Sequence, residues 1–428
     1  MEERGQRVAA LAALLLLFAG LVLQYLCPGG GQCRRRRGGA GGGGGAGGGS
    51  PAEEEAARGD PYGPEDASPA RFVPRRRFRA AELLRRADFR LEGDDLMVFL
   101  HIQKTGGTTF GRHLVRNLRL PRPCRCRAGQ KKCACLRPGR PEPWLFSRFS
   151  TGWSCGLHAD WTELNTCLPG LLPAGAAPGP DNANPAGGGG GTATAPRKFY
   201  YITILRDPVS RYLSEWRHVQ RGATWKASLH VCDGRSPTSE ELPSCYSGDD
   251  WSGCSLQEFM DCPYNLANNR QVRMLADLSL VGCYNLSVMP EEERNQVLLD
   301  SAKENLKHMA FFGLTEFQRK TQYLFEKTFN MSFIAPFTQF NSTRASSVDI
   351  DETTQARIEA LNFLDVALYD YAKDLFLQRY QFTRQKEHQE ARRKRQEQRK
   401  MGRARLSHAK EAEGANSTDY ATNVELWR

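Results

Sequence analysis

The stretch Asp95–Leu120 constrains the fold more than any other part of the chain. Leu96–Ile102 is an almost unbroken apolar run, which is typical of a strand covered on both faces, as in a parallel sheet. Gln103–Thr109 then supplies a lysine, two glycines and three threonines, and apolar residues return at helical spacing from Phe110 to Leu118. The pattern predicts a strand, a tight loop and a helix.

A loop of this kind suits a phosphate group. Glycines let the backbone come close, N–H groups at the helix start point at the anion, and Lys104 adds positive charge. The order differs from the Walker A motif, in which the lysine follows the glycines. The local pattern leaves an ordinary glycine turn between a strand and a helix as the alternative.

Two further apolar runs indicate more buried strands. Phe199–Leu205 is the second strand, and Asp207 and Pro208 after it are typical of the start of a helix. Ala310–Leu314 is the third. Alternating strands and helices predict an α/β fold with a central parallel sheet flanked by helices. Other expected elements are helices at 80–90, 256–278, 291–308, 318–329 (with a capping box from Thr315) and 351–380, and a short strand at 280–283.

Net charge and cysteine content indicate the kind of partner and the redox compartment of the protein. A net charge of +11 favours a polyanionic partner, which can be nucleic acid, anionic lipid or acidic polysaccharide. Eleven of the 13 cysteines lie between Cys124 and Cys283. The CxC spacing at Cys124 and Cys133 differs from the longer spacing that zinc favours. We therefore predict disulfides in an oxidising compartment, with the pairing open and one cysteine left over.

The N-terminal region predicts a membrane anchor. Residues 8–27 are almost wholly apolar and match the ~20 residues that span a bilayer, with a signal peptide as the rival interpretation. The expected organisation is a cytoplasmic tail (1–7), a transmembrane signal anchor (8–27), a flexible Gly-rich stem (28–70), a luminal domain (71–383) with a low-complexity insert (168–197), and a basic tail (384–428). The possible glycosylation sites are Asn285, Asn330, Asn341 and Asn416.

The basic tail has two interpretations. Residues 384–410 hold eleven Lys and Arg against three acidic residues, and apolar residues are scarce. A solvated basic helix or a disordered tail is one interpretation, and electrostatic capture of a sulfated chain is the other. A similar choice applies to Lys131 and Lys132, which lie in a Cys-rich segment and can be either solvated or in contact with a polyanion.

Four strings together carry a resemblance to a known family. HIQKTGGTTF, STGWSCGLHADW, LRDPVSRYLSEW and NLANNRQVRML resemble the heparan sulfate 6-O-sulfotransferases, and the resemblance runs from about Arg71 to Tyr380. It implies a P-loop-like sulfotransferase fold in the Golgi membrane, in single-pass type II orientation. The implied reaction transfers a sulfuryl group from 3′-phosphoadenylyl sulfate to the 6-hydroxyl of glucosamine in heparan sulfate, without a metal. Another regiospecificity, a nucleotide kinase and an inactive glycosaminoglycan-binding Golgi protein are the alternatives.

The resemblance also implies roles for individual residues. Lys104 would stabilise the leaving group. Donor contacts would come from His101, Ile102, Gln103, Lys104, Thr105, Gly106, Gly107, Thr108, Thr109, Arg206, Ser214, Thr338, Gln339, Phe340, Arg344 and Ala345. Acceptor contacts would come from Lys131, Lys132, Arg148, Trp153, His158, His218 and Trp225. Taken without the resemblance, Arg206 can instead pair with Asp207 at a helix end, and Ser214 can be an exposed helix serine.

Three histidines adjoin these segments and are candidates for a general base. An unperturbed imidazole pKa of ~6.5 suits proton abstraction near neutral pH. The residues alone leave His101, His158 and His218 open, and the resemblance selects His158.

Overall fold

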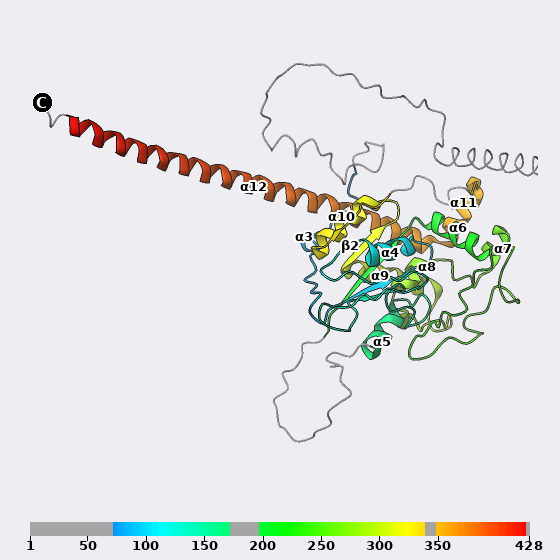
Figure 1. Cartoon of the computed structure of the whole chain (residues 1–428). Helices are drawn as coiled ribbons and strands as arrows, with labels where there is room; N and C mark the ends of the chain where they lie inside the picture. Colours follow the sequence, from blue (N-terminus) through cyan, green and yellow to red (C-terminus); the bar gives the residue numbers. More distant parts are fainter. Residues whose placement is uncertain (1–71, 172–196, 339–347, 425–428) are drawn as a thin grey trace, which may run out of the picture. The chain divides into compact units, whose positions relative to one another are not determined.

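The computed structural model describes residues 72–171, 197–338 and 348–424 (Figure 1). The expected anchor and stem, and most of the low-complexity insert, lie outside the described residues. No helix within the described ranges combines the length and the apolar composition that crossing a bilayer requires.

A four-stranded parallel sheet forms the centre of the domain, with the strand order β3-β1-β4-β5. The predicted parallel sheet is thus confirmed. The helices and strands of the described residues are α3 (Ala80–Leu83), β1 (Leu96–Leu100), α4 (Gly107–Arg116), β2 (Leu118–Arg119), β3 (Leu145–Phe146), α5 (Trp161–Leu171), β4 (Phe199–Leu205), α6 (Pro208–Val219), α7 (Leu256–Asp261), α8 (Arg270–Leu275), the 3-10 helix η1 (Leu278–Val281), α9 (Glu291–His308), β5 (Phe311–Leu314), α10 (Gln318–Phe329), β6 (Ser332–Phe333), α11 (Glu352–Leu361) and α12 (Phe363–Val424).

Helices cover both faces of this sheet (Figure 1). Successive side chains of a strand point to opposite faces, and the two phenylalanines of β5 show the two layers. Phe311 packs against Phe110 of α4 and Phe325 of α10, with ring centroids 5.9 and 5.3 Å away. Phe312 packs against Phe376 of α12 at 6.1 Å. All five residues of β1 are buried for this reason, as its apolar run predicts.

Several expected elements differ in the structure. The helix expected at 256–278 is divided into α7 and α8, because Pro263 follows α7 and Asn269 has a left-handed backbone (φ 47°) before α8. The strand expected at 280–283 is wrong. That segment contains the end of η1, and Gly282 closes the turn in the left-handed region (φ 71°).

Three further expectations about helices differ from the structure. The capping box from Thr315 is wrong, because the N-cap of α10 is Phe317, whose side chain makes no capping hydrogen bond. The helix expected at 351–380 is two helices, α11 and α12, which meet at Asn362. Since α12 continues to Val424, the expected boundary between domain and tail at residue 384 falls inside one helix. The helix expected at 80–90 is only the single turn α3.

Five disulfides confirm the prediction of an oxidised cysteine framework. Cys254 is buried and is the one unpaired cysteine within the described ranges. The pairs are Cys124–Cys135, Cys126–Cys133, Cys155–Cys167, Cys232–Cys283 and Cys245–Cys262.

Candidate active site

The loops that follow β1, β4 and β5 meet at the carboxyl edge of the sheet. The hydroxyl of Thr315 donates to the carbonyl of Thr105 at 2.5 Å, and the Thr315 amide donates to the carbonyl of Leu205 at 3.0 Å. The Arg206 guanidinium donates to the carbonyl of Lys104 at 3.2 Å. Parallel strands bring their carboxyl ends together in this way, and ligands of open α/β sheets bind in the crevice that results.

The segment Gln103–Thr109 forms a tight turn that leads into α4. Lys104 and Gly106 both have left-handed backbones, with φ of 65° and 80°. Gly107 begins the helix and has no room for a side chain, because an added Cβ would lie 2.4 Å from Cδ2 of His101. The first N–H groups of an α-helix lack partners inside the helix and carry partial positive charge. The turn therefore has the backbone geometry that suits a phosphate.

The backbone of Arg206 is held beside this turn by the side chain of Gln271. Gln271 of α8 accepts from the Arg206 amide at 3.0 Å and donates to its carbonyl at 2.9 Å. Arg206 is buried, with 7% of the residue exposed. Burial lowers the pKa of its guanidinium, while the charges of Glu316 and Asp207 act in the opposite direction. Asp207 caps α6 by accepting from the Ser210 amide at 2.8 Å, as the sequence predicted.

Ser214 lies on α6, two turns after Arg206, and its side chain is half-buried. The loop that holds the last donor candidates, Thr338 to Ala345, lies only partly within the described residues. Thr338 is exposed and follows Phe337, a buried ring that stacks on His113 of α4 at 4.0 Å. The remaining donor candidates of this loop lie outside the described residues: Gln339, Phe340, Arg344 and Ala345.

An aromatic cluster lies next to the turn Gln103–Thr109, which we call the phosphate-type loop. The cluster consists of His101, Trp153, His158 and Trp225. His158 is its centre, with ring centroids 4.6 Å from Trp153, 5.3 Å from Trp225 and 4.8 Å from His101. These residues come from three separate segments of the chain. Tertiary structure therefore brings the candidate base and two candidate sugar-binding tryptophans together at the end of β1.

The hydrogen bond of His158 determines its tautomer. Its Nδ1 lies 2.7 Å from the carbonyl oxygen of His101. A carbonyl can only accept, so Nδ1 carries the proton and Nε2 of the neutral ring keeps a lone pair. Burial lowers the pKa of His158 to about 4, against the effect of that hydrogen bond. At neutral pH the ring is therefore an uncharged acceptor.

The other two histidines have different surroundings. The His101 ring is buried, stacks on Phe99 at 5.4 Å and presses against Gly107. Its Nδ1 has no hydrogen-bond partner within the described ranges, and burial puts its pKa well below the usual value. His218 is half-buried on α6, 5.5 Å from Trp225, and burial and the nearby charge of Lys104 lower its pKa.

Basic side chains surround the aromatic cluster. The Arg148 guanidinium lies 5.6 Å from the Trp153 ring and donates to the hydroxyl of Thr108 at 3.4 Å, so it connects the tryptophan to α4. Lys132 extends along the turn before Trp153, with its Cδ 3.1 Å from the position of a Cβ on Gly152. Lys131 is exposed beside it. The candidate acceptor residues thus lie near one another in the fold.

Sequence reasoning assigned no role to Glu215, although it supports the cluster. Its buried carboxylate forms ion pairs with Arg211 and Arg270 and accepts from the indole N–H of Trp225 at 3.1 Å. Burial alone would raise the pKa of Glu215, but the charges of Arg270 and Arg211 lower it to about 2. Glu215 therefore holds Trp225 in place from the helix that also carries Ser214.

A signal for Glu215 was present in the sequence. The apolar stripe of α6 runs through Tyr212, Trp216 and Val219, all of which are buried. Glu215 falls in the same stripe at helical spacing. A charged residue on a buried helix face is rarely tolerated without a partner, so the stripe predicts a buried cation nearby.

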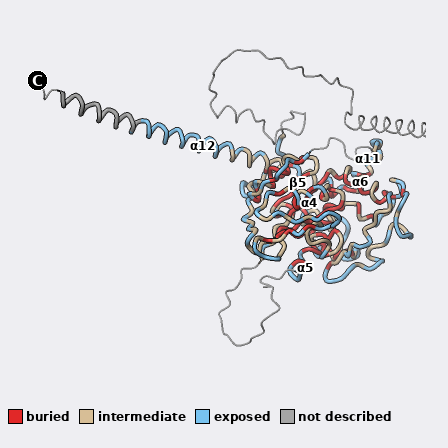
Figure 2. Tube along the Cα trace, in the orientation of Figure 1, coloured by how far each residue is buried: buried red, intermediate tan, exposed pale blue. Residues whose placement is uncertain are grey.

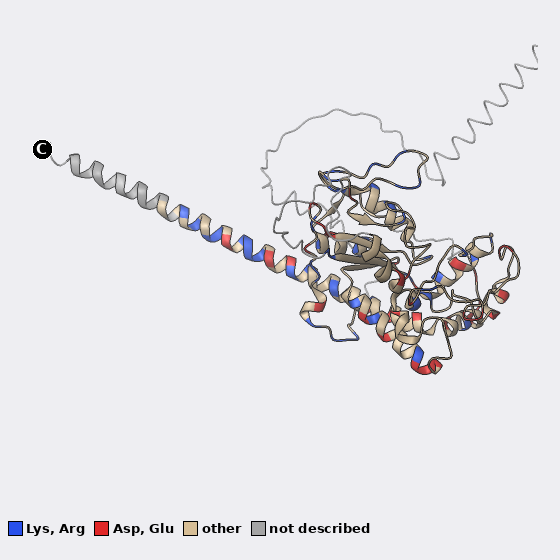
Figure 3. Cartoon of the chain, turned by 90° about the horizontal axis from the view of Figure 1, so that it is seen from below, with Lys and Arg blue, Asp and Glu red and all other residues tan. Residues whose placement is uncertain are grey.

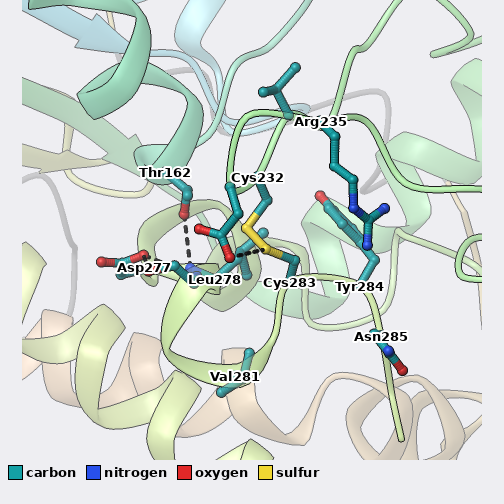
Figure 4. Close-up of a disulfide and its surroundings, with 12 residues drawn as sticks. Thr162, Cys232, Arg235, Asp277, Leu278, Val281, Cys283, Tyr284 and Asn285 are labelled. Atoms are coloured by element: carbon teal, nitrogen blue, oxygen red, sulfur yellow. Dashed lines mark hydrogen bonds between the residues drawn. A yellow bond between two sulfur atoms is a disulfide. The ribbon is translucent and has the colours of Figure 1, made fainter. Parts of the chain in front are cut away.

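Disulfides fix the loops that carry the acceptor candidates. Cys232–Cys283 joins the loop after α6 to the turn after η1 (Figure 4). In the same loop, the Ser228 hydroxyl donates to the carbonyl of Leu157 at 2.8 Å, next to His158. These irregular loops have few backbone hydrogen bonds of the kind that pair strands in a sheet. Disulfides therefore supply part of the structural restraint that holds them.

Among the residues that the structure describes, two groups of side chains have the residue types of a metal site. In the first, Cys232 and Cys283 are joined in a disulfide and offer no thiolate. In the second, Asp160 and Glu163 lie close to His230, but each carboxylate accepts from the backbone N–H of the other at 3.0 Å. Their oxygens therefore already serve the fold, and burial raises the pKa of both carboxyl groups.

The candidate glycosylation sites are placed in part. Asn330 is exposed at the C-terminal end of α10, and Asn285 is half-buried and accepts from Ser287 at 2.7 Å. Asn416 lies on α12, and Asn341 lies outside the described residues.

Comparison with known proteins identifies the family. A family model described as "Sulfotransferase family" matches residues 188–372. The chain is 71% identical to Heparan-sulfate 6-O-sulfotransferase 2 of Gallus gallus over the full length of both proteins. It is 68% identical to the human protein of that name, covering 95% of the chain and 63% of the human protein. Heparan-sulfate 6-O-sulfotransferase 1 of Cricetulus griseus is 71% identical over 74% of the chain and 75% of its own length.

These matches agree with the four strings from which the resemblance was inferred, and they extend over the loops of the site. The chain belongs to the heparan-sulfate 6-O-sulfotransferase family.

Proposed function

We propose that the chain transfers a sulfuryl group from 3′-phosphoadenylyl sulfate to the 6-hydroxyl of glucosamine residues in heparan sulfate. Family membership supports the reaction and the acceptor. The net charge of +11 fits a polyanionic acceptor. By analogy with phosphoryl transfer, the sulfur moves in line between two oxygens, so the protein has to position both substrates and stabilise charge.

His158 is the proposed general base, and one observation carries this role. Its Nδ1–H is committed to the carbonyl of His101, so Nε2 is the free acceptor of a neutral imidazole. An acceptor hydroxyl that meets Nε2 can give up its proton as its oxygen attacks the sulfur. The pKa of about 4 means that the base is unprotonated at neutral pH.

The phosphate-type loop is the proposed donor site. Lys104 and the first amides of α4 would hold the 5′-phosphosulfate and neutralise charge on the leaving oxygen. Arg206 and Ser214 would bind the 3′-phosphate, for which a forked guanidinium is well suited. Because Lys104 supplies a positive charge, we expect transfer to continue in the presence of a metal chelator, unlike the reaction of a magnesium-dependent kinase.

The acceptor chain would lie across the aromatic cluster and the cations around it. Trp153 and Trp225 offer ring faces to a sugar, and Arg148, Lys131 and Lys132 offer charge to its sulfate and carboxylate groups. His218 lies beside Trp225 and would contact the same chain.

We further propose a Golgi membrane protein of single-pass type II topology, with residues 71–383 in the lumen. The five disulfides support an oxidising compartment. Protease protection of the C-terminal part in sealed Golgi vesicles tests the topology. Digestion without detergent would contradict it.

The activity is tested by incubating the protein with labelled donor and desulfated heparan chains, and then mapping the label. We expect label at the 6-hydroxyl of glucosamine. Label at the 2- or 3-hydroxyl would overturn the regiochemistry. Binding of chains with no label at any position would favour an inactive glycosaminoglycan-binding protein.

A further inference from the structure

The part of α12 beyond Glu387 has one side that carries arginines and no acidic residue among the side chains that the structure describes. Arg392, Arg395, Arg399 and Arg403 recur at intervals of three, four and four residues, so they form one stripe on a helix with 3.6 residues per turn. At a rise of 1.5 Å per residue the stripe is roughly 16 Å long. We call these four arginines the basic face.

The acidic residues of this part of α12 lie on the other side and have partners. Glu387 pairs with Lys327 of α10, and Glu390 pairs with Arg86 at 3.8 Å, so this side faces the rest of the domain. Glu397 pairs with Arg393 at 3.7 Å, away from the basic face. The separation leaves the four arginines without a neighbouring negative charge on their own side of the helix.

The basic face is open to solvent. All four arginines are exposed, and none forms an ion pair within the described parts of the chain. Figure 2 shows that this part of α12 is exposed, and Figure 3 shows that Lys and Arg recur along it. An exposed helix face needs no such arrangement of like charges for its stability, since exposed ion pairs of mixed sign would stabilise the helix better.

The composition of this segment separates two kinds of anionic partner. A helix that lies on a membrane surface buries an apolar face among the lipids. Here the larger apolar residues are Met401 and Leu406, which are exposed and lie about 140° apart around the helix. Charge without an apolar face favours a hydrated polyanion over a lipid surface.

We propose that the basic face of α12 binds sulfated heparan chain outside the active site. Guanidinium groups bind sulfate as they bind other tetrahedral anions, through paired N–H donors. This inference rests on the proposed function for the identity of the polyanion. It adds a second contact to the same chain, so a long chain would be bound more tightly than a short one through its higher effective concentration.

The test uses the full chain and two matched variants. Arg395, Arg399 and Arg403 are changed to Gln in one, and Arg393, Lys394 and Arg405 are changed to Gln in the other. Both lose three positive charges from the same helix, and only the first alters the basic face. We expect the first variant to bind long heparan sulfate about tenfold more weakly and the second to lose at most about twofold.

Turnover gives the second readout. In the first variant the KM for long chains should rise, while kcat and the KM for a hexasaccharide acceptor stay unchanged. Equal weakening in both variants, or none in either, would overturn the proposal. So would loss of binding to phosphatidylserine vesicles with no change in binding to heparan sulfate. If the unmodified protein transfers no sulfate, the proposed function fails, whereas the binding comparison still decides the role of the basic face.

Discussion

The two sides of the site are built differently. The proposed donor side consists of strand ends and helix starts, where Thr315 and Arg206 bond to the backbone of the loop after β1. The proposed acceptor side consists of irregular loops that carry Trp153, His158 and Trp225, and disulfides and side-chain contacts hold them. The donor side is therefore set by the sheet, and the acceptor side depends on covalent links and on the buried carboxylate of Glu215.

The largest expected effect is a loss of turnover without a loss of donor binding, and it comes from a change at His158 on the acceptor side. His158→Gln keeps an N–H that can bond to the carbonyl of His101 but removes the proposed general base. We expect kcat to fall about 10³-fold with donor affinity unchanged. The measurement is steady-state kinetics together with calorimetry of adenosine 3′,5′-bisphosphate.

Exposed His308 provides the control, and His308→Gln should have the activity of the unmodified protein. Near-normal turnover in His158→Gln would remove this residue from the reaction.

Lys104→Ala tests the donor side in the same way. Loss of its charge should lower kcat about 10²-fold and also weaken binding of adenosine 3′,5′-bisphosphate, since the leaving oxygen and the phosphate lose a cation. Lys132→Ala is the matched lysine of the acceptor side, and it should raise only the KM of the polysaccharide. The same kinetic pattern in both variants would mean that the two sides are not distinct.

The covalent support of the acceptor side can be removed directly. Cys232→Ser with Cys283→Ser opens a link between residues 51 apart in sequence and should cost about 2–4 kcal/mol of unfolding free energy. We expect the acceptor KM to rise more than the donor KM, because the loop of Trp225 loses its attachment. Thermal denaturation and both KM values give the readout.

Cys254→Ser is the control for the loss of a thiol that forms no disulfide. If the donor KM and the acceptor KM of the double variant changed equally, the Cys232–Cys283 disulfide would not support the acceptor side in particular.

A smaller effect is expected from Trp225→Phe. The ring face is kept, but Glu215 loses the indole N–H that it accepts at 3.1 Å. We expect kcat/KM for the acceptor to fall about tenfold, in line with the loss of one hydrogen bond to a buried charge. Unchanged acceptor kinetics would show that Glu215 does not position this ring.

The smallest effect is a pH dependence that should be nearly flat. The pKa of His158 is lowered to about 4, so the base gains a proton only well below pH 6.5. At pH 5.5 we expect kcat/KM to fall less than about twofold, whereas an imidazole of pKa ~6.5 would lose about tenfold.

The same lowered pKa has a consequence for folding. The unfolded chain binds a proton on this histidine between about pH 6.5 and 4, where the folded chain does not, so stability falls as the pH falls through that range. Far-UV circular dichroism at each pH therefore has to accompany the kinetic measurement.

The donor side could be predicted from the sequence better than the acceptor side. Apolar runs predicted β1, β4 and β5, and the glycines predicted the turn before α4, because these features depend on neighbours in sequence. The short strand β3 was missed, since its two residues lie in an aromatic-rich segment without alternation. The roles of Glu215 and the carbonyl of His101 depend on contacts between distant segments, which a single sequence does not contain.

The same limit applies to the cysteines. Their spacing predicted disulfides but not which cysteines pair, since the pairing depends on how the loops pack. The histidines show it most clearly. The residues alone left three candidates open, whereas the fold shows that Nδ1 of His158 bonds to the carbonyl of His101 and that Nδ1 of His101 is buried without a partner among the described residues.

A crystal structure of the chain with adenosine 3′,5′-bisphosphate and a heparan oligosaccharide tests the central claim most directly. We predict that the 6-hydroxyl of a glucosamine lies within ~2.6–3.2 Å of Nε2 of His158, with the nucleotide phosphates at Lys104 and Arg206. A hydroxyl that faces His101 or His218, or a nucleotide bound away from the loop after β1, would contradict the account.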